Sequence, residues 1–410
     1  MKKRKEKMKT KNRLMAAIVL CALFLVTLAG IGIVSATEDE TLDVYGNANE
    51  DDIIDMRDLT FTARMILRLE DETELADANY DGRVSVADMT QIGLIILGRE
   101  SKLTFVDSAD RIVTVNKPVE SIISGLPETA EVVKILGAWD RAVGRDYYTT
   151  EEMFPFFPGA SELPVVTGPV SLYDVDFEKV FELDPDIFLT YYAPYPELEE
   201  VIATFEPEIP VVTLNFDDPT TMAENIRKLR YVLNTEEKGE EYIAWYEGVI
   251  NSITEKTTGL SEDKKPRIFF WFFSWDYQDQ YMTLAGDYSA VQSQLEIVGG
   301  TNIAEDLTGW FPYVNEEWLM GEDIDVILCW ASSAIVPAFG YSTDDTTVAQ
   351  ETRDWIMDAD ENPALAASDA VKDGKVYLHE HMALSPRVVV TLVSCQPYNV
   401  VSYIMYVLHN

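Results

Sequence analysis

The stretch Asn234–Thr258, NTEEKGEEYIAWYEGVINSITEKTT, decides the fold, because it predicts one long helix between two halves of the chain. Asn234 followed by Glu237 predicts a capping box, and Gly259 is a natural C-terminal stop. A helix of this length spans roughly 37 Å at ~1.5 Å per residue, about the width of a domain. The apolar residues recur at helical spacing and form one stripe: Tyr242, Trp245, Tyr246, Val249, Ile250 and Ile253. We therefore expect the helix 234–258 to join two lobes, with a ligand site in the crevice between them.

Short β-rich runs alternate with helical runs on both sides of this helix. In the first half, 104–233, helical runs such as Glu128–Leu136 and Phe177–Leu183 separate the predicted strands. Those strands are Arg111–Val115, Ser121–Ser124, Ala142–Gly144, Ile187–Tyr191 and Ile209–Leu214. The second half, 266–410, opens with a predicted strand over Arg267–Phe273 and repeats the alternation. The pattern predicts an α/β fold of two doubly wound lobes, with parallel sheets covered by helices on both faces.

The N-terminus predicts an exported protein. Residues 1–13 carry eight Lys or Arg and one Glu, and an apolar run from Leu14 to Ala36 follows. This order is typical of a secretory signal over 1–36, although the run is long enough to stay as a membrane anchor. Only Cys329 and Cys395 follow the signal, so no disulfide framework is expected, and the sequence leaves open whether these two pair.

Composition excludes several classes of partner. The chain has 410 residues and 47% hydrophobic content, which is enough for two or three packed units. Its formal net charge is −39. So acidic a surface argues against nucleic acid and anionic lipid as partners. It suits a protein that lives among divalent cations or at high salt.

An internal repeat of period 30 occupies residues 40–100. Its two copies read NANEDDIIDMRD over 47–58 and DANYDGRVSVAD over 77–88, and an apolar helical run follows each. Oxygen ligands at loop positions 1, 3, 5, 7, 9 and 12 are what a Ca²⁺ ion requires. The predicted ligands are Asn47, Asn49, Asp51, Ile53 (carbonyl), Asp55, Asp58, Asp77, Asn79, Asp81, Arg83 (carbonyl), Ser85 and Asp88. Gly82 supplies the sharp turn at position 6, and in the first copy Asp52 has to take that role.

With a single helix after each loop, residues 40–100 resemble a dockerin module, which makes this part of the chain a small all-α unit. The resemblance implies two structural calcium ions and a cohesin-like partner. Dockerins meet that partner at the loop–helix junctions, which lie here near Met56, Arg57, Val86 and Ala87. These are not the hydroxyl pairs common in the family.

The two halves contain no motif for catalysis, such as a nucleophile elbow or a phosphate-binding loop. They carry instead an ordered series of short motifs. In chain order these are Val133–Gly137, Arg141–Gly144, Leu183–Ile187, Leu295–Asp306, Val314–Leu319, Asp325–Cys329, Asn362–Pro363, Ala370–Tyr377 and Ser385–Arg387. Together they resemble the substrate-binding proteins of ABC importers that serve ferric siderophores and cobalamin. Residues 394–410 depart from the pattern of that family, so the tail of the second lobe is atypical.

The resemblance implies docking to a permease through one Glu on each lobe, facing Arg residues of the membrane partner. By position these match Glu197 and Glu317, with Glu199, Glu200 and Glu316 as neighbouring alternatives. Exposed carboxylates at the lobe tips would make two charge-assisted contacts.

For the ligand, we expect the loops at the carboxyl ends of the strands to line the cleft. The candidates are Tyr147, Tyr148, Tyr191, Tyr192, Trp275, Trp330 and Arg387. Trp271 is an alternative to Trp275 but is more typical of a core position, inside Phe269–Phe273. Aromatic walls with one cation suit a bulky anionic ligand or a planar metal complex.

These features predict a secreted or cell-surface substrate-binding component of an ABC transporter, which captures a ferric siderophore or cobalamin and is not an enzyme. The sequence does not separate siderophore, corrinoid and haem. An alternative is a cell-surface scaffold component, tethered through its calcium-loop module, whose bilobed domain has lost its ligand. A cofactor-binding enzyme is a third option, and the missing metal and nucleophile motifs count against it.

Overall fold

A computed structural model describes residues 41–152, 154–169, 171–192, 196–273, 281–286, 289–309, 311–331 and 345–380. The predicted signal over 1–36 and the atypical tail over 394–410 lie outside these ranges. Within them, no helix combines the length and the apolar character that a membrane crossing requires.

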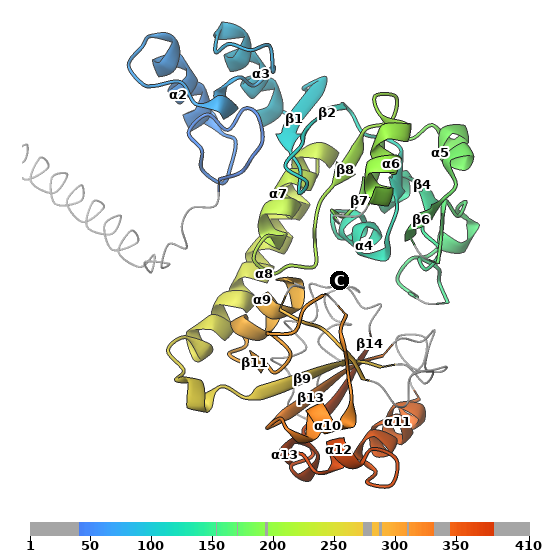
Figure 1. Cartoon of the computed structure of the whole chain (residues 1–410). Helices are drawn as coiled ribbons and strands as arrows, with labels where there is room; N and C mark the ends of the chain where they lie inside the picture. Colours follow the sequence, from blue (N-terminus) through green and yellow to red (C-terminus); the bar gives the residue numbers. More distant parts are fainter. Residues whose placement is uncertain are drawn as a thin grey trace, which may run out of the picture. The chain divides into compact units, whose positions relative to one another are not determined.

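The 30-residue repeat forms two similar loop–helix units, which we call the calcium-loop module (residues 42–100; Figure 1). Helix α2 spans Met56–Ile66 and α3 spans Val86–Ile96, with the short 3₁₀ helix Glu74–Ala76 between them. Each helix begins with a capping box, in which the N-cap side chain and the Asp at N3 bond each other's backbone. The same polar pattern therefore starts both helices.

Lobe 1 (residues 102–233) holds a parallel four-stranded sheet in the order β4-β3-β7-β8. Its strands are β3 Ile122–Ser124, β4 Ala142–Arg145, β7 Ile187–Thr190 and β8 Val211–Thr213. Alternate residues along these strands belong to two separate apolar clusters, because successive side chains point to opposite faces. The sheet is thus buried on both faces, as the sequence predicted.

The helices of lobe 1 follow its strands in the order expected of βα units. They are α4 Pro127–Ile135, α5 Phe177–Leu183, α6 Pro196–Phe205 and α7 Met222–Leu233. Two hairpins flank the sheet. The first pairs β1 Lys102–Val106 with β2 Ile112–Asn116, and the second pairs β5 Thr167–Gly168 with β6 Ser171–Val175.

The interlobe helix is α8, Glu236–Thr257, and its start corrects the sequence analysis. The predicted capping box at Asn234 is wrong, because Asn234 adopts a left-handed φ of 52° and ends the preceding helix α7. Asn tolerates this conformation, so the residue was needed as a C-cap. Thr235 becomes the N-cap without a side-chain hydrogen bond. Gly259, with φ of 80°, follows the end of the helix as predicted.

The apolar stripe of α8 is only partly buried. Tyr242, Tyr246 and Ile253 lie in the interior, whereas Trp245, Val249 and Ile250 are half-buried. The first part of the helix packs against α7, where Gly239 permits close approach. A Cβ at that position would lie 2.6 Å from Cδ of Arg230.

Lobe 2 (residues 266–380 of the described ranges) contains a mixed sheet in the order β12-β10-β9-β13-β14, with β11 paired to β9. The strands are β9 Arg267–Phe272, β10 Tyr281–Thr283, β11 Thr301–Asn302, β12 Tyr313–Val314, β13 Val326–Ala331 and β14 Val376–Glu380. Its helices are α9 Ser289–Ile297, α10 Glu316–Met320, α11 Thr347–Met357, α12 Pro363–Ala366 and α13 Asp369–Lys372.

The expectation of a purely parallel sheet is wrong for lobe 2. Strand β10 runs antiparallel to both β9 and β12, while β13 is parallel to β9 and β14. The connection from β9 to β10 explains the difference, because a parallel crossover needs about a dozen residues or more and residues 273–280 are fewer. The predicted fold class, two α/β lobes joined by one long helix, is otherwise confirmed.

Candidate functional site

Four of the predicted ligand residues follow the strands of lobe 1 at one edge of its sheet. Tyr147 and Tyr148 come after β4, and Tyr191 and Tyr192 come after β7. Because β3, β4, β7 and β8 are parallel, their carboxyl ends share this edge. Tyr147 is 51% exposed and Tyr192 is 39% exposed, so both rings are accessible to a ligand. We call this surface the tyrosine edge.

Buried polar groups hold the loop after β4 in place. The backbone N–H groups of Tyr148 and Thr149 donate to Oδ1 of Asp146 at 2.7 and 3.1 Å. The buried guanidinium of Arg145 donates to the carbonyls of Ala160 (2.8 Å) and Asp146 (2.9 Å). The Tyr148 hydroxyl donates to the Pro169 carbonyl at 3.0 Å. The two tyrosines therefore stand on a preorganised loop, which is what a binding site requires.

The tyrosine edge also carries carboxylates that the sequence analysis missed. Glu128 lies in the first turn of α4, Asp146 follows β4 and Asp217 follows β8. Burial raises the pKa of Glu128 to about 7, and the negative charges of Asp146 and Asp217 add to the rise. Burial also raises the pKa of Asp146. Their position just after predicted strands could have identified them as residues of the sheet edge. In a chain with 71 Asp and Glu residues, however, three acidic residues do not stand out.

Little of the matching edge of lobe 2 lies in the described ranges. Strands β9, β13 and β14 lead into residues 274–280, 332–344 and 381–410, so Trp275 and Arg387 lie outside the described residues. Trp330 is half-buried near the end of β13. The centroid of its ring lies 5.5 Å from that of Phe270 and 5.7 Å from that of Phe272. Trp271 is a core residue with 3% exposure, as expected.

The two predicted docking carboxylates lie in the first turns of helices. Glu317 in α10 is exposed, as predicted. Glu197 in α6 is half-buried, and its Oε2 is buried without a hydrogen-bond partner among the described residues. The expectation that Glu197 is a fully exposed tip residue is therefore wrong. Its neighbours Glu199 and Glu200 are exposed.

The second calcium loop is closed by backbone donors. Oδ1 and Oδ2 of Asp77 accept the N–H groups of Asp81 (3.0 Å) and Gly82 (2.7 Å). Gly82 has a φ of 90°, so the glycine supplies the turn at position 6 as predicted. Asp88, which is buried, accepts the N–H groups of Asn79 (3.1 Å) and Ser85 (2.7 Å).

The first calcium loop shares the hydrogen bonds of the Asp at position 12 but lacks those of the side chain at position 1. Asp58 accepts the N–H groups of Asn49 (3.1 Å) and Asp55 (2.7 Å), just as Asp88 does in the second loop. Asn47 instead donates from Nδ2 to the carbonyls of Leu42 (2.8 Å) and Asp51 (2.6 Å). Asp52 is not among the residues with positive φ, so the prediction that it makes the sharp turn is wrong.

The residues of the first loop leave an oxygen suited to a metal ion. Oδ1 of the fully buried Asn47 has no hydrogen-bond partner among the described residues. A buried amide oxygen without a donor is costly, and a hard cation such as Ca²⁺ would satisfy it. Across the described ranges, however, no group of three or more His, Cys, Asp or Glu is arranged to hold a metal ion. Calcium binding stays a prediction.

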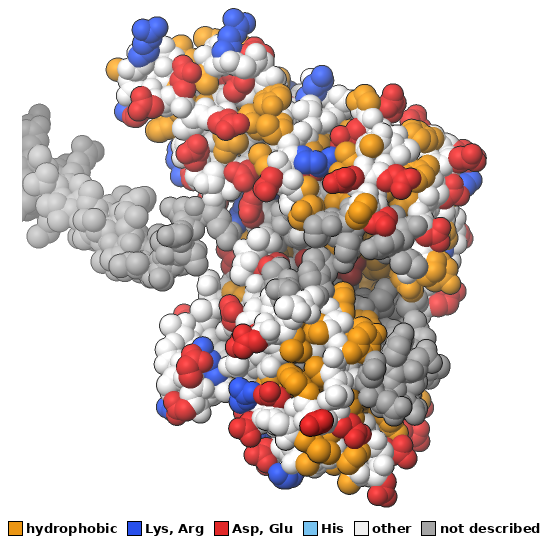
Figure 2. All heavy atoms as spheres, in the orientation of Figure 1, with side chains coloured by type: hydrophobic (Ala, Val, Ile, Leu, Met, Phe, Trp, Pro, Cys, Tyr) orange, Lys and Arg blue, Asp and Glu red, His pale blue; other side chains and the backbone are white. Residues whose placement is uncertain are grey.

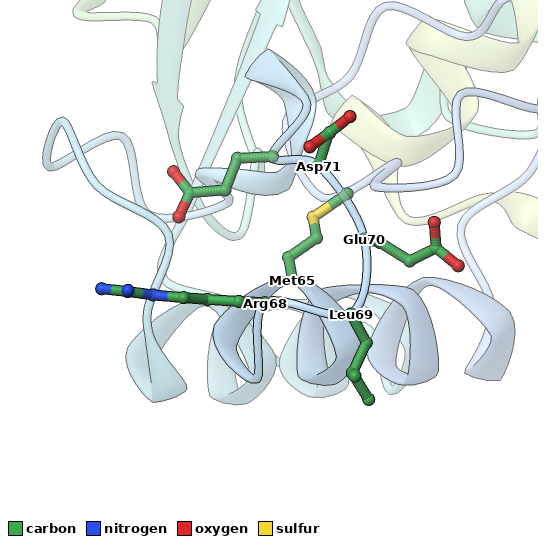
Figure 3. A pocket seen from close by; sticks show the side chains of 6 residues that line it. Met65, Arg68, Leu69, Glu70 and Asp71 are labelled. Carbon is green, nitrogen blue, oxygen red and sulfur yellow. The ribbon is translucent and has the colours of Figure 1, made fainter.

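An open pocket of about 440 Å³ lies in the connection after α2 (Figure 3). It is lined by Met65, Arg68, Leu69, Glu70, Asp71 and Glu72. All six belong to the calcium-loop module, so this pocket is separate from the tyrosine edge. Figure 2 shows that acidic side chains are spread over the visible face, as the net charge of −39 leads one to expect.

Comparisons with known proteins agree on the two-lobed part. A family model described as periplasmic binding protein matches residues 122–381, more than half of the chain. The molybdate-binding protein MolA of Haemophilus influenzae is 22% identical over 242 residues, and the alignment covers 52% of this chain and 65% of that protein. The chain thus spans slightly less than two thirds of that relative.

Two solved structures from Vibrio cholerae resemble the chain in fold. The periplasmic haem-binding protein HutB has a TM-score of 0.51 and 17% identity, covering 68% of this chain and 99% of that one. The periplasmic vitamin B12-binding protein BtuF has a TM-score of 0.50 and 19% identity, covering 72% and 99%. At such identities the likeness concerns the fold alone.

Proposed function

We propose, from the premise that this chain belongs to the periplasmic binding protein family, that it captures a solute outside the cytoplasmic membrane and delivers it to the permease of an ABC importer. One observation carries the proposal: the family match runs through both lobes and α8, which are the parts that make a two-lobed binding unit. The family consists of binding proteins, so the prediction that the chain is not an enzyme is confirmed.

The proposed ligand is an iron complex, such as a ferric siderophore or haem, or cobalamin. The exposed rings of Tyr147 and Tyr192 offer flat surfaces to a large planar ligand. HutB and BtuF, which share the fold, are named for haem and vitamin B12. Molybdate, for which MolA is named, fits less well, because a small oxyanion would make little use of the exposed rings of Tyr147 and Tyr192.

A thermal-shift screen of the whole chain tests the ligand class, since a bound ligand stabilises the folded state by RT ln(1 + [L]/Kd). The panel holds a ferric siderophore, haem, cobalamin and molybdate. We expect one of the first three to raise Tm and molybdate to have no effect. The variants Tyr147→Ala and Tyr192→Ala should weaken binding of the ligand found. Tyr80→Ala, an equally exposed tyrosine in the calcium-loop module, is the matched control.

The proposed docking residues are Glu317 on lobe 2 and Glu197, with Glu199 and Glu200 as neighbours, on lobe 1. Reversal of Glu197 or Glu317 to Arg should leave ligand affinity within a factor of about 3, which is below ~1 kcal/mol, while permease binding falls sharply. Since Glu197 is half-buried, Glu199→Arg is the informative companion on α6. Collapse of ligand affinity would place these carboxylates in the pocket instead.

We also propose that the calcium-loop module holds Ca²⁺ in both loops, with the predicted ligands of positions 1, 3, 5, 7, 9 and 12. The orphaned Oδ1 of Asn47 and the closely matched hydrogen bonds of Asp58 and Asp88 support this. Calcium titration of the full chain by calorimetry tests it. Two equivalents are expected, and an absence of binding would remove the proposal.

A cohesin-like protein is the proposed partner of this module. The loop–helix junction residues Met56, Arg57, Val86 and Ala87 are all exposed, so a partner can reach them. In the alternative, a cell-surface scaffold without a ligand, this contact would be the main function of the chain. Ligand binding in the thermal-shift screen separates the two, because the scaffold reading predicts no ligand.

A further inference from the structure

The calcium-loop module shares its core with lobe 1. Leu42, Val44, Ile54, Ile92 and Ile95 belong to the same buried apolar cluster as residues of lobe 1, which include Leu103, Phe105, Tyr231 and Leu233. The backbone is shared as well. Tyr45 N–H donates to the Thr104 carbonyl and Val106 N–H to the Asp43 carbonyl, both at 2.9 Å. Residues 43–45 thereby extend the β1–β2 hairpin by one short strand segment.

The first loop meets helix α7, and Asp43 ahead of it also lies 3.8 Å from Nζ of Lys228 in that helix. The backbone N–H of Ile54, at loop position 8, donates to the Tyr231 hydroxyl at 3.0 Å, and Ile54 is buried. One residue before position 7, the carboxylate of Asp52 lies 3.8 Å from the Arg227 guanidinium. A buried hydrogen bond next to a predicted metal-ligating carbonyl ties the geometry of the loop to the position of α7.

Helix α7 in turn contacts the interlobe helix α8 through two ion pairs. The Arg227 guanidinium, which is largely buried, also pairs with Glu247 of α8. One turn further along, Arg230 pairs with Glu240 and packs against Gly239 of α8. Arg227 thus bridges the first loop and the helix that joins the lobes.

Among the described residues, no hydrogen bond or ion pair joins the second loop, 77–88, to α7. Loop positions 3, 5 and 7 are exposed in the second loop (Asn79, Asp81 and Arg83). The same positions are half-buried in the first loop (Asn49, Asp51 and Ile53), while at position 2 both Ala48 and Ala78 are buried. Within the part of the chain that the structure describes, the side-chain hydrogen bonds of residues 77–88 stay inside the module. The two copies of the repeat therefore have different environments: the first loop contacts α7, and the second is more exposed to solvent.

We propose that the first calcium loop is one of the surfaces through which the module braces lobe 1, so that an ion bound there stiffens α7 and α8. The proposal rests on the calcium site proposed above. It makes the module part of the solute-binding body instead of a separate tether. By reciprocity, if calcium stabilises the contact of Ile54 with Tyr231, then loss of that contact weakens calcium by the same factor.

Hydrogen exchange of the full chain, with calcium and with chelator, tests the brace. We expect calcium to slow exchange in α7 and in the first half of α8 by about fivefold or more, within the range of ordinary coupling. Strand β13 in lobe 2 is the internal reference and should not change. A change confined to residues 42–100 would overturn the brace and leave the calcium site standing.

A matched pair of variants locates the coupling. Tyr231→Phe removes only the hydroxyl that accepts from Ile54, and we expect it to weaken one of the two calcium sites by about tenfold. Tyr80→Phe makes the same change at position 4 of the second loop, which is not a predicted ligand position, and should leave both affinities unchanged. Equal affinities in Tyr231→Phe and the parent chain would overturn the proposal. Absence of calcium binding in the parent chain would overturn the calcium site as well, while solute binding is judged by the thermal-shift screen.

Discussion

The two calcium loops follow one sequence pattern, 30 residues apart, and end in different structures. At position 12 they are alike, since Asp58 and Asp88 accept the same two backbone donors at the same distances. At positions 1 and 6 they differ, because Asn47 bonds to Leu42 and Asp52 faces Arg227, whereas Asp77 bonds within its loop and Gly82 turns the chain. The two copies therefore share the Asp that caps the helix after each loop. They differ at the positions where the first loop contacts other parts of the chain.

The largest effect should come from the ion pair that joins the module to lobe 1. Nζ of Lys117 lies 3.4 Å from the Glu100 carboxylate and donates to the carbonyls of Tyr231 and Val232, and both side chains of the pair are buried. Lys117→Met removes the buried donor of both carbonyls and of the Glu100 carboxylate, which a neutral lysine would keep, and should lower the free energy of unfolding by about 3 kcal/mol. Denaturant unfolding measures this. A change near zero would mean that the joint contributes little.

The control for this variant is the double replacement Glu100→Gln with Lys117→Met. It removes both charges and should recover a large part of the loss, because no unpaired buried charge remains. If the double variant is as unstable as the sum of the single ones, the two residues do not interact.

The same joint should respond to alkaline pH. Burial lowers the pKa of Lys117 to about 8, against the opposing effect of Glu100, so the folded chain releases this proton before the unfolded chain does. Between pH 8 and the ordinary lysine pKa of about 10.5 the unfolded state binds more protons, and stability from this group rises with pH. We expect a rise of about 1–3 kcal/mol in unfolding experiments. The rise should be missing in Lys117→Met.

Substitutions at position 1 of the two loops should affect stability and calcium affinity differently. In chelator, Asn47→Ala strips donors from two carbonyls at a buried site and should cost about 2 kcal/mol of unfolding free energy. Asp77→Ala frees only N–H groups at the exposed residues Asp81 and Gly82, and should cost about 0.5 kcal/mol or less. For calcium affinity we expect the opposite order, with Asp77→Ala the more damaging variant, since Asp77 is a charged residue among the predicted ligands. Equal costs in chelator would contradict the contrast between the loops.

The smallest effects should appear at position 6. Gly82→Ala forces a side chain into the conformation at φ 90° and should cost about 1 kcal/mol. Asp52→Ala should cost less than about 0.5 kcal/mol in stability, because it loses one half-exposed ion pair. A thermal-unfolding comparison of both variants in chelator would decide the order.

Several parts of the molecule were predictable from local sequence. The strand Arg267–Phe272, the helix Phe177–Leu183 and the paired loops all appear where the alternation and the repeat placed them. The four tyrosines stand at one sheet edge for the same reason, because parallel strands that end together put the following residues side by side. The roles of these tyrosines and of the docking carboxylates remain predictions.

Other features depended on partners far away in the sequence. The capping role given to Asn234 failed because α7 ends there and competes for the same residue. The antiparallel β10 was missed because the alternation of strand and helix does not reveal which strand pairs with which. The half-burial of Glu197 likewise arises from neighbours that assemble only in the fold. The same holds for the raised pKa of Glu128, to which Asp146 and Asp217 contribute.

The sequence by itself determined the local units: the repeat of two loop–helix units, the α/β alternation and the long helix between the halves. These follow from periodicity and from backbone preferences that act within a few residues. Only the tertiary structure decided that the module shares a core with lobe 1 and that its first loop touches α7 while its second stays open. Such contacts join residues that are far apart in the sequence, such as Ile54 and Tyr231. A pattern that spans a few residues does not predict which of these distant residues will be buried together or form an ion pair.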